Sequence, residues 1–271
     1  MIGTTKSLGQ KHLLDKFYTK EDIVKQCLSL LDLTQYDCII EPSAGAGAFS
    51  SANPHYMYDI EPEGASIIQA DWLTLDKSIF AQYSKILVVG NPPFGQQSSL
   101  AKKFFNESAK FAHTIAFILP LSFKKDSVQN QLNLNFILAK EIILPRNSFS
   151  LNGQDYELPC VFQVWDRSPR PRSKKRLKTT TSLFSFCNKG DADFRIQRVG
   201  GNAGKASFDL ERAISSNYFV KNTSNFSNEE LVNIINSLSF PSIAMTVGPK
   251  SLAKGELIAT LEEYCETLDN E

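Results

Sequence analysis

Polar residues that can bind a ligand follow several short apolar segments of the chain. Glu41-Pro-Ser-Ala-Gly-Ala-Gly comes directly after one such segment, Asp59 and Asp71 follow two others, and Asn91-Pro-Pro-Phe follows a fourth. A Gly-x-Gly turn lets the backbone approach a ligand closely. In nucleotide-binding sheets of parallel strands, an acid after the second strand commonly binds ribose hydroxyls. Asp59 or Asp71 taken alone is better explained as a helix cap or turn residue.

The most specific of these signals is Asn91-Pro92-Pro93-Phe94. Consecutive prolines fix the backbone and leave carbonyl groups without amide partners, so that a ligand can use them. The amide oxygen of Asn91 and a rigid neighbouring carbonyl can both accept hydrogen bonds from one planar amino group, and the ring of Phe94 can stack on a flat heterocycle. The alternative for this segment is a plain proline-rich turn.

Strands and helices alternate in the first part of the chain. Apolar segments predict strands at residues 38–41, 56–60, 66–70, 86–90, 114–119, 136–144 and 161–166, and the periodicity predicts helices at 22–33 and 98–111. Fully apolar strands that alternate with helices indicate a parallel sheet covered on both faces. Open sheets of this kind bind ligands at the carboxyl ends of their strands, where the polar residues above are found.

A smaller α+β unit is predicted after this sheet. Strands are expected at residues 193–199 and 217–221, and helices at 227–238, opened by a capping box at Ser227 and Glu230, and at 251–268. The proline-containing basic segment between the two parts predicts a linker. The sequence therefore predicts a first domain over residues 1–166, a linker over 167–181 and a second domain over 182–271.

The chain is neutral overall, with 29 basic and 29 acidic residues, but its charge is unevenly distributed. Residues 1–165 carry a net charge of −2, residues 166–212 carry +7 and residues 213–271 carry −5. The basic region is placed to bind a phosphate backbone, and the alternatives are a solvated linker or a localisation signal. The expected phosphate contacts are Arg170, Arg172, Lys174, Lys175, Arg176, Arg195 and Arg198. The glycine-rich loop that ends at Gly204 is either a close approach to nucleic acid or a turn.

Taken in order, Phe17-Tyr18-Thr19, the Glu41 segment, Asp59, Asp71 and Asn91-Pro-Pro-Phe resemble the motifs of class I S-adenosylmethionine-dependent amino-methyltransferases. More narrowly, they resemble the gamma class of N(6)-adenine DNA methyltransferases, over about residues 13–166. The resemblance implies a Rossmann-like, seven-stranded, mostly parallel methyltransferase sheet, with S-adenosyl-L-methionine as cofactor and no metal. It also implies that residues 1–166 form the catalytic domain and that residues 182–271 form a target-recognition region that binds nucleic acid.

The resemblance also implies roles for individual residues. The cofactor-binding set would be Tyr18, Thr19, Glu41, Ser43, Gly45, Gly47, Asp59, Ile60, Asp71 and Asn91. Asn91 and the Pro92 carbonyl, on the backbone that Pro93 helps to fix, would hold the target amine. Phe94 would stack on the target base, with Phe149 on its other face. The chain departs from the family between Gly47 and Asp59, where only eleven residues predict a short first helix and leave Glu61 as an alternative to Asp59.

The leading hypothesis is methylation of adenine in DNA, by direct transfer to a base that is flipped out or unpaired. RNA is the alternative substrate, and a catalytically degenerate nucleic-acid-binding partner is the alternative class of protein. The basic segment argues against glutamine methylation in proteins. The polar residues 1–11, the absence of a long apolar run and the scattered cysteines predict a cytoplasm-like or nucleic-acid-containing compartment, without secretion or membrane partner.

Overall fold

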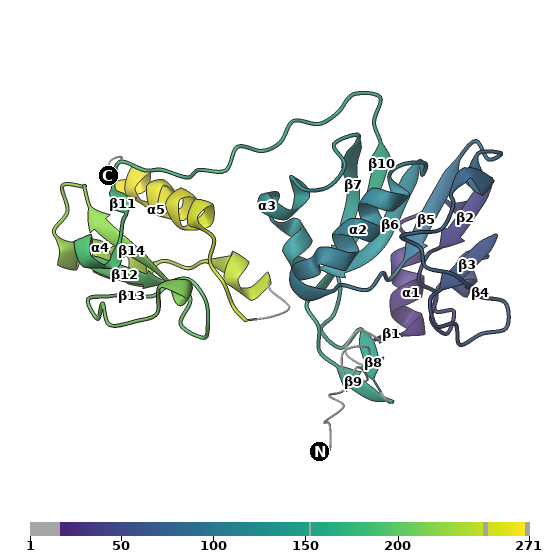
Figure 1. The fold of residues 1–271 in the computed structure, drawn as a ribbon, viewed down its shortest axis with the longest axis horizontal. Coiled ribbons are helices and arrows are strands. Elements are labelled where there is room, and N and C mark those ends of the chain that lie inside the picture. Colours follow the sequence, from purple (N-terminus) through teal and green to yellow (C-terminus); the bar gives the residue numbers. More distant parts are fainter. Residues whose placement is uncertain (1–16, 152, 246–248, 269–271) are drawn as a thin grey trace, which may run out of the picture. The chain divides into compact units, whose positions relative to one another are not determined.

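The chain forms two compact units, which Figure 1 shows as a ribbon. The computed structural model describes residues 17–151, 153–245 and 249–268, so the polar start used above lies outside the described residues. The first unit runs to Lys124 and continues from Val128 to Lys174, and the second has Lys125–Ser127 and the chain from Lys175 onward. The boundary at Lys174 lies inside the predicted linker.

The first unit is built on a seven-stranded sheet in the order β4-β3-β2-β5-β6-β10-β7. Its strands are β2 (Cys38–Glu41), β3 (Tyr56–Asp59), β4 (Ile68–Gln69), β5 (Ile86–Gly90), β6 (Thr114–Pro120), β7 (Phe136–Ile143) and β10 (Cys160–Arg167). The first five pair in parallel, whereas β10 runs antiparallel to both β6 and β7. This sheet confirms the expected Rossmann-like methyltransferase fold.

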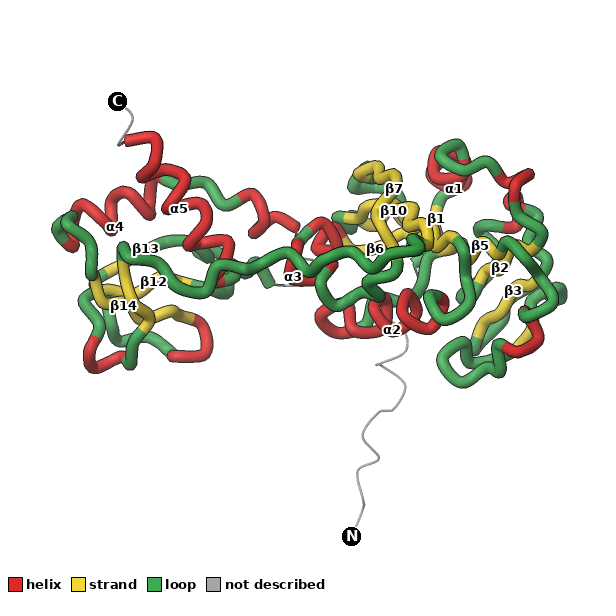
Figure 2. Tube along the Cα trace, turned by 90° about the horizontal axis from the view of Figure 1, so that it is seen from above, coloured by secondary structure: helices red, strands yellow, loops and turns green. Residues whose placement is uncertain are grey.

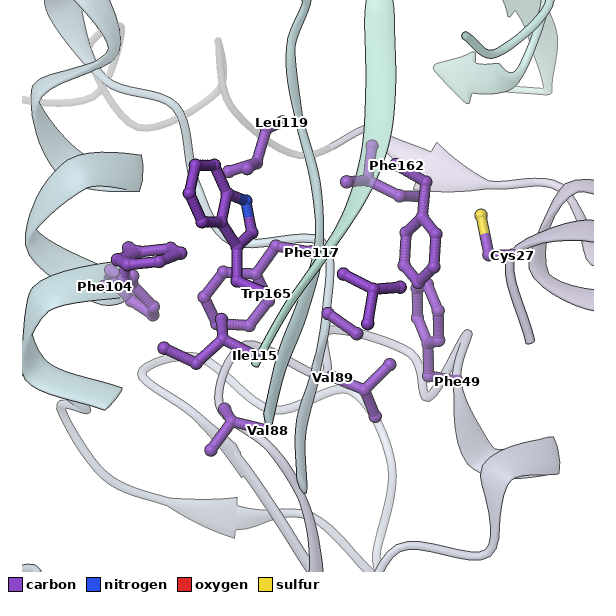
Figure 3. Close-up of a cluster of buried hydrophobic side chains, with 14 of the residues drawn as sticks. Cys27, Phe49, Val88, Val89, Phe104, Ile115, Phe117, Leu119, Phe162 and Trp165 are labelled. Atoms are coloured by element: carbon purple, nitrogen blue, oxygen red, sulfur yellow. The ribbon is translucent and has the colours of Figure 1, made fainter. Parts of the chain in front are cut away.

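Helices cover both faces of the sheet, as the fully buried strands β2, β5 and β6 require. Helices α1 (Glu21–Leu28) and α2 (Ser99–Ser108) lie on opposite sides of the strands in Figure 2. Figure 3 shows the two apolar layers, with Cys27 from α1 on one side and Phe104 from α2 beside Trp165 on the other. A short helix α3 (Asp126–Gln129) follows β6.

The connection between β2 and β3 is short, as the spacing predicts. It contains a 3-10 turn at Ser50–Ala52 and no α-helix. The predicted helix 22–33 ends early, at Leu28, and a 3-10 turn at Leu33–Gln35 follows. The carboxylate of Asp32 accepts a hydrogen bond from the N–H of Thr34 at 3.2 Å, which begins that separate turn.

A small antiparallel sheet holds the Phe-Tyr-Thr segment, and the sequence did not predict it. Strand β1 (Tyr18–Thr19) pairs with β8 (Phe149–Leu151), which pairs in turn with β9 (Gln154–Tyr156). Thr19 is directly opposite Phe149. The side chain of Phe149 is fully buried, with its ring edge-on to Phe17. The expectation that Phe149 stacks on the target base is therefore wrong, because this ring belongs to the core.

The second unit is a four-stranded antiparallel sheet, in the order β11-β14-β12-β13, with two helices. The elements are β11 (Phe184–Phe186), β12 (Phe194–Gln197), β13 (Ala206–Ser207), β14 (Asn217–Asn222), α4 (Asn228–Ser237) and α5 (Lys254–Leu268). The two strands predicted in this unit are β12 and β14, which pair with each other, and the predicted capping box between Ser227 and Glu230 is confirmed. In the described part of the chain, no helix is long and apolar enough to cross a membrane.

Replacing Phe149 with alanine is expected to lower the free energy of unfolding of the first unit by about 3–5 kcal/mol, because it leaves a cavity in the core. The chain's 2 tryptophans, Trp72 and Trp165, both lie in the first unit, so fluorescence during urea unfolding reports on that unit alone. Ile143→Ala is the control, since Ile143 is 57% exposed and its loss should cost less than about 0.5 kcal/mol. Equal effects of the two substitutions would contradict the burial of Phe149.

Candidate functional site

A cavity of about 890 Å³ opens at the carboxyl ends of β2, β3, β4 and β5. It brings together residues that lie far apart in the sequence, as expected for the edge of a parallel sheet. The predicted residues that line it are Tyr18, Thr19, Glu41, Ser43, Gly45, Asp59, Ile60, Asp71, Asn91, Pro92, Pro93 and Phe94. Gly47 lies in the same turn but does not line the cavity, and its N–H donates to the Ala44 carbonyl, so its contact with the cofactor stays a prediction.

The glycine turn after β2 is tied to the end of β3 by one carboxylate. Asp59 accepts hydrogen bonds from the N–H of Gly45 at 2.7 Å and from the N–H of Glu61 at 2.8 Å. Gly45 adopts a φ of 55°, a left-handed conformation that favours glycine. Asp59, rather than Glu61, therefore holds the turn in place, and both residues reach the cavity.

Glu41 ends β2 with its side chain inside the protein, only 1% exposed. One carboxyl oxygen accepts a hydrogen bond from the N–H of Phe49 at 3.4 Å, and the other has no partner among the described residues. Burial raises the pKa of Glu41 to about 8, and the negative charge of Asp59 acts in the same direction. Without a cationic partner, this carboxyl group is therefore mostly protonated at neutral pH.

The side-chain amide of Asn91 has a defined orientation. Its nitrogen donates to the hydroxyl of Thr19 at 3.2 Å and to the backbone carbonyl of Phe17 at 3.5 Å. Its oxygen is buried and has no hydrogen-bond partner within the part of the chain that the structure describes. Ser43 also donates to the backbone carbonyl of Asn91, at 3.1 Å. The residue thus presents a fixed, unused acceptor at the cavity wall.

A tight turn positions the residues that follow Asn91. The carbonyl of Phe94 accepts hydrogen bonds from the N–H groups of Leu100 and Ala101, at 3.1 and 3.3 Å. Gly95 has a φ of 66°, and a Cβ atom there would lie 2.7 Å from Cγ of Leu100, so only glycine fits. The ring of Phe94 is largely buried in the cavity wall, with 9% of the residue exposed.

The cavity lining also includes polar and apolar groups suited to a nucleoside. The hydroxyl of Tyr18 donates to the carboxylate of Glu63 at 2.8 Å, which joins β1 to the segment after β3. Ile60 is 58% exposed beside Asp59, where an aromatic ring could cover it. Asp71 lines the cavity and also accepts from the N–H of Leu73 at 2.9 Å, so it serves as a turn residue as well.

Sequence reasoning missed several residues of this wall. Glu63, Trp72 and Gln96 line the cavity, and no motif singled them out. Phe17 was part of the quoted Phe-Tyr-Thr segment but received no role; it lines the cavity and stacks on Tyr156 with the ring centres 4.6 Å apart. Only its place in that segment could have indicated it.

Two cations expected on a phosphate backbone, half-buried Arg172 and buried Arg195, are instead bonded to oxygens of the protein. Arg172 donates to the carbonyl of Phe136 at 2.9 Å, and its guanidinium lies 5.5 Å from the ring centre of Trp165. Arg195 is 7% exposed and donates to the side chain of Asn217 at 2.9 Å. The prediction is wrong for both, because internal oxygens already use these guanidinium groups. The side chains that remain exposed are Arg170, Lys174, Lys175, Arg176 and Arg198.

The cavity fits the cofactor that the resemblance implies. Glu41 and Asn91 each contribute a buried oxygen without a partner to the same wall, and an unpartnered buried acceptor is costly unless a ligand donates to it. The methionine part of S-adenosylmethionine carries an ammonium group, and its adenosine carries hydroxyl and amino donors. Residues 17–19, 41–45, 59–60 and 71 would hold it.

Comparisons with known proteins point in the same direction. The model of the EDM2 methyltransferase-like domain family matches residues 35–170. The Arabidopsis thaliana protein ENHANCED DOWNY MILDEW 2 is 30% identical over 120 residues, which are 43% of this chain and 9% of that protein. This chain thus spans less than a tenth of that relative's length.

Solved structures with a similar fold have low sequence identity to this chain. A candidate RNA methyltransferase from Pyrococcus horikoshii is 12% identical, with a TM-score of 0.45 over 59% of this chain and 91% of its own. A protein from Thermoplasma acidophilum is 14% identical, with a TM-score of 0.40 over 58% of this chain and 93% of its own.

The pKa of Glu41 makes the stability of the first unit depend on pH. Between the ordinary value of 4.5 and about 8, the folded chain holds one proton more than the unfolded chain at this residue. The free energy of unfolding should therefore fall by about 1.4 kcal/mol per pH unit as the pH rises through this window. Glu41→Gln, which stays neutral, should lack this contribution. Urea unfolding followed by tryptophan fluorescence tests it, and parallel pH profiles for the two proteins would contradict it.

Proposed function

The chain belongs to the EDM2 methyltransferase-like domain family, and on that premise we propose that it is an S-adenosylmethionine-dependent methyltransferase acting on the N6 amine of adenine in DNA. The observation that carries the proposal is the amide of Asn91. Its oxygen is buried without a partner beside Pro92 and Phe94, while its nitrogen is already bonded. Such a group can accept a hydrogen bond from an amine N–H.

The residues of the cavity fit transfer to an aromatic amine. The lone pair of an exocyclic amine is delocalised into its ring, which makes the nitrogen a poor nucleophile. Acceptors at Asn91 Oδ1 and at the Pro92 carbonyl would accept hydrogen bonds from its two N–H groups and shift the nitrogen toward sp3 geometry, so that the lone pair leaves the π system of the ring and can attack the methyl group. Phe94 would hold the ring itself by stacking. When bound, S-adenosylmethionine supplies an electrophilic methyl group, so the chain contributes positioning and preorganised acceptors.

The target base must leave its stack to reach these acceptors. Asn91 is half-buried and Phe94 almost fully buried in the cavity wall, so a base paired inside a duplex cannot present its amine to them. The base therefore enters either flipped out of a duplex or from a single strand. The choice of DNA rests on the resemblance to the gamma class, and RNA is the alternative that the same acceptors would serve.

A degenerate, non-catalytic pocket would be expected to have lost its ligand-facing groups or to be filled by side chains. Here the cavity of about 890 Å³ is open, and Glu41, Asp59, Asp71 and Asn91 all reach it. These features support a catalytic role over that of a binding partner.

Methyl transfer from labelled S-adenosylmethionine should appear on an adenine-containing DNA oligonucleotide. Duplex DNA, single-stranded DNA and RNA of one sequence are compared, and the product nucleoside is identified by mass. Asn91→Ala should lower the rate at saturating cofactor by about 10²–10³-fold, the usual cost of losing one preorganised group. Asn188→Ala, at an exposed position in the second unit, is the control. Label on RNA alone would replace DNA as substrate, and label on protein alone would refute both.

Thr19 should act as a positioning residue for Asn91. Thr19→Val removes the hydroxyl that fixes the amide nitrogen, so the oxygen loses its orientation and kcat should fall by about tenfold. Thr19→Ser keeps the hydroxyl and should recover most of the rate. A purely structural role would instead lower the unfolding midpoint and leave kcat at saturating substrates unchanged, so both are measured for each variant. A kcat for Thr19→Val equal to that of wild type would refute the role.

A further inference from the structure

Exposed cations gather on one side of the second unit, outside the methyltransferase domain. Arg198 follows β12, Lys250 lies on the segment before α5, and Lys254 is the first residue of that helix. Backbone hydrogen bonds join the two segments: Leu252 N–H donates to the Arg198 carbonyl at 2.8 Å, and Gly200 N–H donates to the Lys250 carbonyl at 2.9 Å. We call Arg198, Lys250 and Lys254 the basic face.

Aromatic rings lie beneath two of these cations. The guanidinium of Arg198 is 5.4 Å from the ring centre of Tyr218, and the ammonium of Lys254 is 4.1 Å from that of Phe186. The two rings meet edge to face at 5.3 Å, and the Tyr218 hydroxyl is fixed by the Leu252 carbonyl at 3.0 Å. Contact with a ring restricts a long side chain before any partner arrives, which lowers the entropy lost on binding.

The basic face has no carboxylate partner among the described residues, unlike several other cations of this unit. Lys189 pairs with Glu211 at 2.8 Å, and Arg212 pairs with Asp209 at 2.8 Å. For Arg198, Lys250 and Lys254 no ion pair is formed within the described ranges. Glu256, close to Lys254 in sequence, accepts from the backbone N–H of Ala253. The positive charge of the basic face is therefore not neutralised at short range.

A loop with little side-chain bulk borders the basic face. Gly200 and Gly204 have φ values of 108° and 92°, which only glycine adopts readily, and they close a tight loop after Val199. Gly201 is exposed, and a Cβ atom added there would meet nothing within 4 Å. The backbone of this loop can therefore come close to a ligand lying on the neighbouring cations.

We propose that the basic face and the adjoining glycine loop bind the phosphate backbone of a nucleic-acid strand. Lysine and arginine side chains and exposed backbone N–H groups are the usual partners of phosphate, and they set register without reading sequence. The inference deepens the proposed function and rests on it, because it assigns this surface to the substrate of the methyl transfer. In this proposal, exposed Lys250 and Lys254 take the phosphate-contact role that the sequence predicted for Arg195, which is buried.

The test compares two triple variants of the full chain that lose the same charge. Arg198→Gln/Lys250→Gln/Lys254→Gln removes the basic face. Lys189→Gln/Lys205→Gln/Arg212→Gln removes cations that bind Glu211, the Asn236 carbonyl and Asp209. Affinities for labelled duplex DNA, single-stranded DNA and RNA are measured by fluorescence anisotropy between about 50 and 200 mM KCl. Urea unfolding checks that each variant folds.

Loss of the basic face should reduce the slope of log K against log salt by about 2 to 3, since each phosphate contact contributes a little under one unit. The matched triple should leave the slope near that of wild type. Equal slopes for the two triples would overturn the proposal. So would a wild-type chain that binds poly-glutamate through the basic face but binds no oligonucleotide, because the surface would then recognise acidic protein.

Failure of this inference and failure of the proposed function give different results. A basic-face triple with an unchanged salt slope, in a chain that still methylates oligonucleotides, refutes the surface and keeps the reaction. A reduced slope in a chain that transfers no methyl group to any oligonucleotide refutes the reaction and supports the surface as a nucleic-acid contact.

Discussion

Hydrogen bonds at the nitrogen of a side-chain amide decide where its oxygen points, because both atoms lie in one rigid plane. In Asn91 the nitrogen is bonded to Thr19 and to the carbonyl of Phe17, so the oxygen is directed by groups more than seventy positions away. The parallel sheet places Asn91 at the end of β5, and the pairing of β1 with β8 places Thr19 against it. The orientation of the Asn91 oxygen thus depends on both the seven-stranded sheet and the small sheet that contains β1 and β8.

The charge balance of the cavity follows from burial. Its wall contains the acids Glu41, Asp59, Glu61, Glu63 and Asp71, which would repel one another if all were charged and unpartnered. Backbone N–H groups donate hydrogen bonds to Asp59, and the hydroxyl of Tyr18 donates to Glu63. The raised pKa of Glu41 keeps its carboxyl group mostly neutral, which removes one of the repelling charges. Such a wall favours a cationic ligand, since a nearby positive charge would return Glu41 to its ionised form.

The elements predicted best from sequence were those whose residues are buried on every side. Residues 38–41 and 86–90 are strands with those bounds, because a continuous apolar run at this length fits a central parallel strand. The β8–β9 hairpin was missed, since its short strands hold Phe149 in the core and leave Tyr156 exposed, without an alternating pattern. Charge alone misled at Arg172 and Arg195, because sequence does not show which carbonyl groups a folded chain will turn toward a guanidinium. Asn91 was predicted as an acceptor from its motif, whereas the role of Thr19 in orienting it needed coordinates.

The pairing of β1 with β8 has a consequence for the order in which the molecule is completed. The N-terminal part of a nascent chain leaves the ribosome first, but Thr19 has no strand to pair with until residues near Phe149 have emerged. A chain synthesised only through β6 possesses Asn91 and the glycine turn, yet its acceptor has no defined direction. The Asn91 oxygen therefore gains its orientation only after β8, near the end of the first unit, has been synthesised.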